Sequence, residues 1–174
     1  MVPRLHRGHY LSLLNRLFLV DELPPWHSNR LTRLIKTPKL HLGDSGLACA
    51  LLGHDPATLY RDRAALGQLL ETFVYHELKR QASFGPDEIR FHHFLDKDGI
   101  EVDLVLERGA HELVGVEVKA LATVTARDFR GLRKLAEASD ERFVCGIVLY
   151  DGDVGARFGD RLHAVPIGAL WTTP

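Results

Sequence analysis

Two carboxylates interrupt the most strand-like stretch of the chain, residues 99–120. Asp103 lies in the first apolar run, GIEVDLVLE, and Glu117 lies in the second, ELVGVEVKA, with Lys119 two residues further on. A short turn at Gly109 joins the runs, so the pattern predicts an antiparallel hairpin. Acids and an amine inside such a hairpin are side chains that can hold a cation and orient water.

The apolar residues of this hairpin indicate its register. Folding about Ala110 brings together three apolar pairs, Val102 with Val118, Leu104 with Val116 and Leu106 with Val114. The same register sets Asp103 opposite Glu117 and Glu101 opposite Lys119 on the other face. A slip of one residue would set valines against acids, which disfavours it.

Directly opposed residues have Cβ atoms roughly 4.5 to 5.5 Å apart, and like charges there repel each other. Three arrangements relieve the repulsion between Asp103 and Glu117: exposure to solvent, a shared proton, or a divalent cation between them. Val105 and Gly115 share this face with the two acids, which indicates that the acidic face is not simply exposed to solvent. The metal-bound arrangement makes Asp103 and Glu117 candidate ligands, whereas Glu101 and Lys119 form an ordinary ion pair.

The helix predicted from ALGQLLETFVYHELKRQ supplies two further acids. Its apolar stripe consists of Leu66, Leu69, Leu70, Phe73, Val74 and Leu78. Glu77 lies near the middle of this stripe and Glu71 at its edge. A buried carboxylate without a partner is costly, so either acid is a candidate to join the cluster, the alternative being a backbone cap or an arginine partner. His92 and His93 are adjacent and so point to opposite faces of a strand, which means that at most one of them can face the acids. His93 is a weaker candidate ligand than the carboxylates.

The surrounding elements predict a mixed α/β domain with a central three-strand meander. The order is helix 65–81, strands 88–96, 99–107 and 112–120, helix 126–139, and strands 142–150 and 163–170. Before them, a helix at 8–18, extended FLVDEL and PKLHLGD, and a helix capped by Asp44 or Ser45 resemble part of a winged helix. The polar connection 54–63 divides the chain into residues 1–55 and 56–174.

Composition excludes several classes of protein. The 174 residues are 45% hydrophobic, enough for one good core with a small appendage. No apolar run approaches the ~20 residues of a membrane span, and the start of the chain does not resemble a secretory signal. Cys49 and Cys145 lie in apolar contexts and predict free thiols and a cytoplasmic location. No Cys or His spacing typical of structural zinc occurs.

Charge gives little support to a general nucleic-acid binder, because the net charge is −1. Basic residues nevertheless gather before residue 40: Arg4, Arg7, Arg16, Arg30, Arg33, Lys36 and Lys39. They predict either contact with phosphates or an ordinary solvated surface. The run LFLVDE at 17–22 is similar to a Walker B strand, but no GxxxxGK[ST] accompanies it, so no ATP site is predicted in this chain.

A GxxxE motif from Gly67 to Glu71, then Asp103 and Glu117-Val118-Lys119 in a meander, resembles the PD-(D/E)XK nuclease superfamily, with EVD in place of PD. More closely, GQLLETFVYHEL, GIEVDLVLE, VGVEVKA and DFRGL are similar to a domain of unknown function that follows the ATPase module of prokaryotic AAA+ ATPase-like proteins. YLSLLNRLFLVDELPPW and PKLHLGDSGL are similar to the region just before that domain. The ATPase module itself is absent here.

This resemblance implies a restriction-endonuclease-like fold and hydrolysis of DNA phosphodiesters with Mg²⁺ or Mn²⁺. Asp103 and Glu117 would hold the metal, and Glu71 would join directly or through water, with Glu77 as a further candidate. Lys119 would position the attacking water or offset charge in the transition state. The alternative is a catalytically inactive module that binds DNA or docks on an AAA+ ATPase module or another protein, with oligomers possible and no membrane partner.

Overall fold

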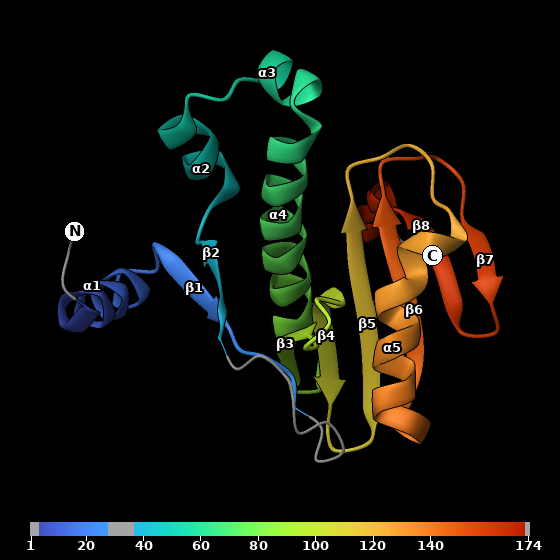
Figure 1. Cartoon of the computed structure of the whole chain (residues 1–174). Helices are drawn as coiled ribbons and strands as arrows, with labels where there is room; N and C mark the ends of the chain where they lie inside the picture. Colours follow the sequence, from blue (N-terminus) through green and yellow to red (C-terminus); the bar gives the residue numbers. More distant parts are fainter. Residues whose placement is uncertain (1–3, 28–36, 173–174) are drawn as a thin grey trace.

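A six-stranded mixed sheet forms the centre of the molecule (Figure 1). The computed structural model describes residues 4–27 and 37–172. The strands are β3 (Ile89–Leu95), β4 (Glu101–Arg108), β5 (Glu112–Lys119), β6 (Phe143–Tyr150), β7 (Ala156–Gly159) and β8 (Leu162–Pro166). Their order across the sheet is β3-β4-β5-β6-β8-β7. The predicted mixed α/β architecture is confirmed, and the predicted meander is β3–β4–β5, although it forms one side of the sheet and not its centre.

The last two strands differ from the prediction. The sequence predicts one final strand over 163–170, but β8 ends at Pro166, and a 3-10 helix, Ile167–Trp171, follows it. β7 was not predicted, and it pairs antiparallel with β8. Strands β5, β6 and β8 run parallel to one another, which requires a crossover between β5 and β6.

Two helices cover the two faces of the sheet. Helix α4 (Arg63–Ser83) contributes Val74 and Tyr75 to one apolar cluster, and α5 (Arg130–Ser139) contributes Leu132 and Leu135 to the other. Helix α5 is the crossover between β5 and β6 and lies along them in Figure 1. Gly115 of β5 lets α5 approach, because a Cβ there would lie 2.6 Å from a methyl of Leu132. The sheet face that carries Gly115 is therefore covered, as predicted.

Strand β4 contains one residue more than regular pairing with β3 allows. His92 pairs with Val105, but Phe94 pairs with Val102, so two residues of β4, Asp103 and Leu104, lie opposite one residue of β3. This irregularity is a β-bulge, a feature that re-aims side chains and is common beside active sites. The extra residue lies in the segment that contains Asp103.

The bulge changes the faces that the sequence pattern predicts for β4. Leu104 and Leu106 pair with Val116 and Val114, as predicted. Val102 instead packs in the α5 cluster, whereas Val118 packs in the α4 cluster. The predicted contact between Val102 and Val118 is therefore wrong, because alternation is broken between Val102 and Leu104.

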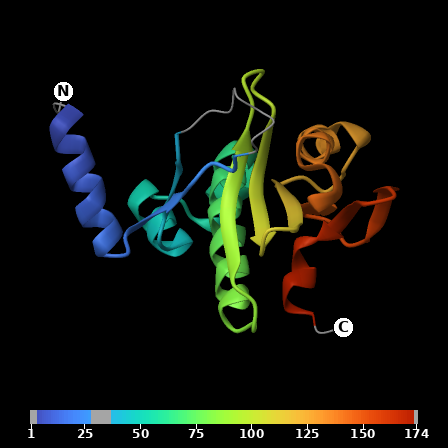
Figure 2. The same ribbon diagram turned by 90° about the horizontal axis from the view of Figure 1, so that it is seen from below.

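The N-terminal segment carries its own small sheet. Its elements are α1 (Arg4–Arg16), β1 (Val20–Leu23), β2 (Lys39–Leu42) and α2 (Ser45–Leu52), followed by α3 (Pro56–Arg61) in the predicted polar connection. Strands β1 and β2 pair antiparallel as a separate two-stranded sheet. Figures 1 and 2 both show α1 away from the six-stranded sheet. Arg30, Arg33 and Lys36 lie outside the described residues.

The N-terminal segment nevertheless shares the core of the main sheet. Leu23 is fully buried in the α4 cluster, and Trp26 is buried in the α5 cluster. The backbone N–H of Trp26 donates to the carbonyl of His93 at 2.7 Å, and that of His93 donates to Pro24 at 3.0 Å. The predicted division at residues 55 and 56 therefore separates side chains that pack together. No helix among residues 4–27 and 37–172 has the length and apolarity that crossing a membrane requires.

Helix α4 begins at a side-chain cap. One carboxylate oxygen of Asp62 accepts hydrogen bonds from the backbone N–H groups of Ala64 and Ala65. We expect Asp62→Ala to lower the free energy of unfolding, measured in urea, by about 1 kcal/mol, because these two groups lose their acceptor. Asp62→Asn keeps an acceptor and serves as the control. An equal loss in both variants would show that capping is not the cause.

Candidate functional site

Lys39, the first residue of β2, lies among three carboxylates of α4 and β4. Its Nζ is 2.8 Å from Oε1 of Glu71 and 3.4 Å from Oδ1 of Asp103, and it also contacts the carboxylate of Glu101. Burial alone would lower the pKa of the Lys39 amine, but the charges of Asp103 and Glu71 outweigh burial and raise it. A positive group therefore does lie within the predicted acidic cluster, and it is an ammonium from the N-terminal segment.

Asp103 connects β4 to β5 through its side chain. Its Oδ2 accepts a hydrogen bond at 2.9 Å from the backbone N–H of Val118. Regular pairing between the two strands extends only as far as Leu104 and Val116. The side chain of Asp103 thus accepts the hydrogen bond that a backbone carbonyl of β4 would accept if regular pairing continued. Asp103 is therefore not directly opposite Glu117, although the sequence pattern predicts that pair. Its other oxygen, Oδ1, faces Lys39.

Glu117 and Lys119 form the second half of the site. Lys119 Nζ donates to Oε1 of Glu117 at 2.6 Å. Oε2 of Glu117 is buried and has no hydrogen-bond partner within the described part of the chain. Burial, and then the negative charge of Asp103, raise the pKa of Glu117 to about 7. The predicted pair of Glu101 with Lys119 is wrong, because Glu101 contacts Lys39 instead.

Glu71 joins the cluster as predicted, but Glu77 does not. The Glu77 carboxylate accepts from Arg80 at 2.5 Å and from Gln81 at 3.0 Å, farther along α4. Its partner is thus an arginine, the alternative left open by the sequence. His93 is also held elsewhere, because its Nε2 lies 3.0 Å from the carbonyl oxygen of Thr37.

Two hollows flank the cluster. One of about 310 Å³ is lined by Asp103 and Lys119 together with Arg63. The other, of about 580 Å³, is lined by Lys39 and Glu101. Glu71 and Gln68 line both hollows. The acids therefore border space on two sides, large enough in each case for small ions and water.

His41 is a neighbour that sequence reasoning missed, as was the role of Lys39. Its Nδ1 lies 3.1 Å from Oγ1 of Thr72, and its Nε2 lies 4.0 Å from Oε1 of Glu71. Burial, and then the charge of Lys39, lower the pKa of His41 to about 4, so the ring is neutral at pH 7. The available signal was the pattern PKLHLG, in which Lys39 and His41 are two residues apart and so share one face of a strand.

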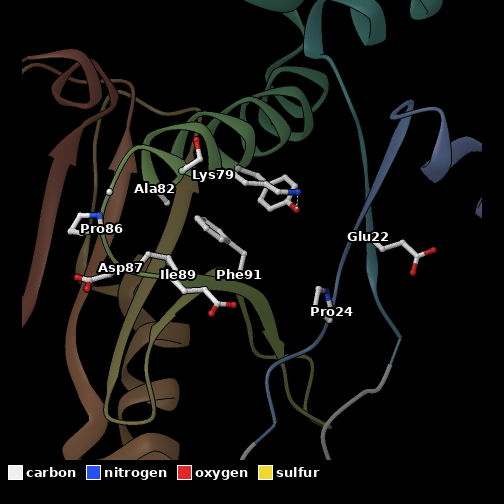
Figure 3. A pocket seen from close by; sticks show the side chains of 12 residues that line it. Glu22, Pro24, Lys79, Ala82, Pro86, Asp87, Ile89 and Phe91 are labelled. Atoms are coloured by element: carbon white, nitrogen blue, oxygen red, sulfur yellow. Dashed lines mark hydrogen bonds between the residues drawn. The ribbon is translucent and has the colours of Figure 1, made fainter.

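A further pocket of about 570 Å³ lies near the other end of α4 (Figure 3). Figure 3 shows Glu22 and Pro24 from the N-terminal segment together with Lys79 and Phe91. Lys79 forms an ion pair with Asp21. None of the acids of the predicted site lines this pocket, so it is separate from the cluster.

The donor atoms of the cluster determine which metal it suits. Mg²⁺ keeps several waters and is commonly held by one or two carboxylates plus substrate phosphates. Within the described ranges, no group of three or more His, Cys, Asp or Glu side chains is placed to hold a metal ion. Asp103 and Glu117 fit a two-carboxylate set, because Oε2 of Glu117 has no hydrogen-bond partner among the described residues, and burial and the charge of Asp103 raise the pKa of Glu117. Glu71 contacts the Lys39 ammonium, as Asp103 does, and it remains a candidate to join the metal directly or through water.

Several known proteins are similar to this chain. The uncharacterized proteins Mb2031c of Mycobacterium bovis and Rv2008c of Mycobacterium tuberculosis are each 27% identical to it over 164 residues. These matches cover 94% of this chain but only 35% of each relative, so the chain spans about a third of their length. A chain in an assembly of Thermococcus gammatolerans McrB AAA+ hexamers with bound McrC is 11% identical, with a TM-score of 0.43, over 91% of this chain and 59% of that one.

Two families match consecutive parts of the sequence. Residues 5–58 match a domain of unknown function designated DUF8612. Residues 66–170, which contain most of α4, the meander and all the acids of the cluster, match a domain of unknown function designated DUF4143. Because this second match spans more than half of the sequence, the chain belongs to the DUF4143 family.

Proposed function

We propose that the chain is a PD-(D/E)XK nuclease-type module that hydrolyses DNA phosphodiesters with Mg²⁺ or Mn²⁺. The supporting observation is the uncompensated charge of the cluster. Four carboxylates, those of Glu71, Glu101, Asp103 and Glu117, face the two ammonium groups of Lys39 and Lys119, which leaves a net charge of −2 when all six groups are ionised. The proposal includes a restriction-endonuclease-like sheet and a winged-helix-like N-terminal segment.

Each side chain of the site has a role in this proposal. Asp103 and Glu117 would hold the metal, which supplies a Lewis acid for a phosphate oxygen. Lys119, fixed by its ion pair with Glu117, orients the attacking water and offsets negative charge on the phosphate oxygens. The water oxygen would form a bond to phosphorus while the bond to the leaving sugar oxygen breaks; the attacking water gives up a proton to solvent, and the leaving oxygen takes one up from solvent. Arg63 lines the same hollow, where one of its nitrogens donates to Asp151 at 3.0 Å, and its remaining N–H groups would bind a phosphate.

The test is cleavage of single- and double-stranded DNA during titration with Mg²⁺ or Mn²⁺. We expect cleavage that requires the metal and that is lost in Asp103→Asn and Glu117→Gln, because each change removes a carboxylate ligand. Glu77→Gln is the matched control, since Glu77 lies on the same helix as Glu71 but contacts Arg80. Cleavage that persists in both site variants, or no metal binding by the protein, would reject the proposal.

The position of Lys39 favours a second candidate function, a catalytically inactive nuclease-fold module. The Lys39 ammonium already contacts Glu71 and Asp103, so these two acids have a positive partner without a metal. The partner would be a protein such as an AAA+ ATPase module, and the exposed Phe18 and Leu51 of the N-terminal segment, 88% and 69% accessible, are suitable contacts. Binding to the part of the mycobacterial relatives outside the matched region, unchanged in EDTA, would support this candidate. Loss of that binding on chelation would count against it.

A further inference from the structure

We propose that Lys39 is an internal competitor for the divalent cation, and that the metal site opens when the Lys39 side chain leaves the cluster. This inference rests on the proposed function for the identity of the metal site, and it adds a device that controls access to that site. The device would lie in the N-terminal segment, whereas the acids that it controls lie in α4 and β4.

The contacts of Lys39 show what it competes for. Its ammonium touches one oxygen each of Glu71, Glu101 and Asp103, and its side chain is only 21% exposed. The Asp103 oxygen that it faces is Oδ1, the one not committed to the backbone of Val118. A metal held by Asp103 needs that same free oxygen. Because two positive groups this close repel each other, the ammonium and the metal exclude one another.

The structure also provides space into which Lys39 can move. Lys39 begins β2, which pairs with β1 in a sheet separate from the six-stranded sheet. Its side chain lines the hollow of about 580 Å³, together with His41 and Leu52. A lysine stem of four carbons can swing its ammonium into this hollow without breaking a strand of the main sheet.

His41 offers a second position for the ammonium. With the ring hydrogen on Nδ1, directed to Oγ1 of Thr72, Nε2 carries a lone pair and is an acceptor. Nε2 is buried and has no hydrogen-bond partner among the residues that the structure describes. In this tautomer Nε2 of His41, a residue that lines the hollow, is an unused acceptor that a displaced Lys39 can bind.

The test is direct measurement of Mn²⁺ binding by calorimetry and by the electron paramagnetic resonance signal of free Mn²⁺. We expect Lys39→Met to bind Mn²⁺ about tenfold more tightly than the wild type, because the competing charge is gone. Lys39→Arg keeps the charge and is expected to show no gain. Lys134→Met is the surface control, because Lys134 pairs with exposed Glu137 at 3.2 Å.

Equal Mn²⁺ affinities of the wild type and Lys39→Met would overturn the inference. If circular dichroism shows that Lys39→Met does not fold, Lys39→Gln replaces it, because an amide retains a hydrogen-bond donor for Glu71 without the charge. DNA cleavage measured in parallel separates the two proposals. Tighter Mn²⁺ binding without cleavage by any variant would reject the nuclease function alone. If the protein cleaves DNA with metal but Lys39→Met binds Mn²⁺ no more tightly than the wild type, only the role of Lys39 would be rejected.

Discussion

Lys39→Met is expected to lower the free energy of unfolding by about 3 kcal/mol at pH 8 without divalent metal, because removing one partner of a largely buried ion pair leaves uncompensated charge. Glu71 and Asp103 both lose their contact with the Lys39 ammonium. The side chains of Glu71 and Asp103 are only 22% and 12% exposed, so water is a poor replacement for the lost ammonium. Urea denaturation in EDTA, followed by circular dichroism, measures the loss.

The control for this prediction is Lys134→Met, which breaks the ion pair with Glu137 at the surface. Both side chains are well exposed, 38% and 69%, so we expect a change within about 0.5 kcal/mol. Saturating Mn²⁺ should restore part of the stability that Lys39→Met loses, since a bound ion again neutralises Asp103. A Lys39→Met variant as stable as the wild type in EDTA would show that the cluster does not depend on this ammonium.

Glu117→Gln is expected to raise the free energy of unfolding by about 2 kcal/mol at pH 8, since burial and the charge of Asp103 oppose ionisation of Glu117. The pKa of Glu117 rises from 4.5 to about 7 on folding, so between these values the folded chain keeps a proton that the unfolded chain has released. The stability that this proton provides is complete below pH 4.5 and is lost as pH rises through 7. Glutamine does not titrate, and its oxygen still accepts from Lys119.

Urea denaturation at pH 5 and pH 8 checks this second prediction. The wild type should lose stability between the two values, and the loss should be smaller in Glu117→Gln. Glu137→Gln, at an exposed position on α5, should keep the wild-type dependence on pH. A Glu117→Gln variant less stable than the wild type at pH 8 would show that the ion pair with Lys119 outweighs the cost of burying Glu117.

Local patterns in the sequence predicted the hairpin well but not its irregularity. The register at Leu104 and Val116 follows from alternation within two neighbouring strands. The bulge depends also on how β4 pairs with β3 on its other side, where Phe94 meets Val102. A period of two residues in β4 alone contains no sign of that third strand. The face of Val102 was therefore predicted wrongly, although its burial was predicted correctly.

The candidate site shows the same division between local and distant information. Glu71, Asp103, Glu117 and Lys119 were predicted from one contiguous region of the chain, but Lys39 is 64 residues from Asp103. Such a contact has no signature in a pattern of neighbouring residues, and Lys39 was placed in a basic segment expected to face phosphates or solvent.

Glu77 illustrates a different error. The angular position of Glu77 around the helix axis predicts a place in the middle of the apolar stripe. That angle contains no information on the position of Glu77 along the axis. At 1.5 Å per residue, Glu77 lies about 9 Å from Glu71 along the helix. There it meets Arg80 and Gln81, and Gln81 in turn donates to the carbonyl of Leu170 near the end of the chain.

The hydrogen bonds between His93 and the backbone of Pro24 and Trp26 have a practical consequence for experiments on shortened chains. β3 is the outermost strand on its side of the sheet, and the segment Pro24–Trp26 shields part of its rim. A fragment that starts at residue 56 would leave this rim open and uncover Phe94, against which Trp26 packs. The unpaired backbone groups of an exposed edge strand pair with other chains, so such a fragment is expected to aggregate. Activity assays therefore require the N-terminal segment to be present.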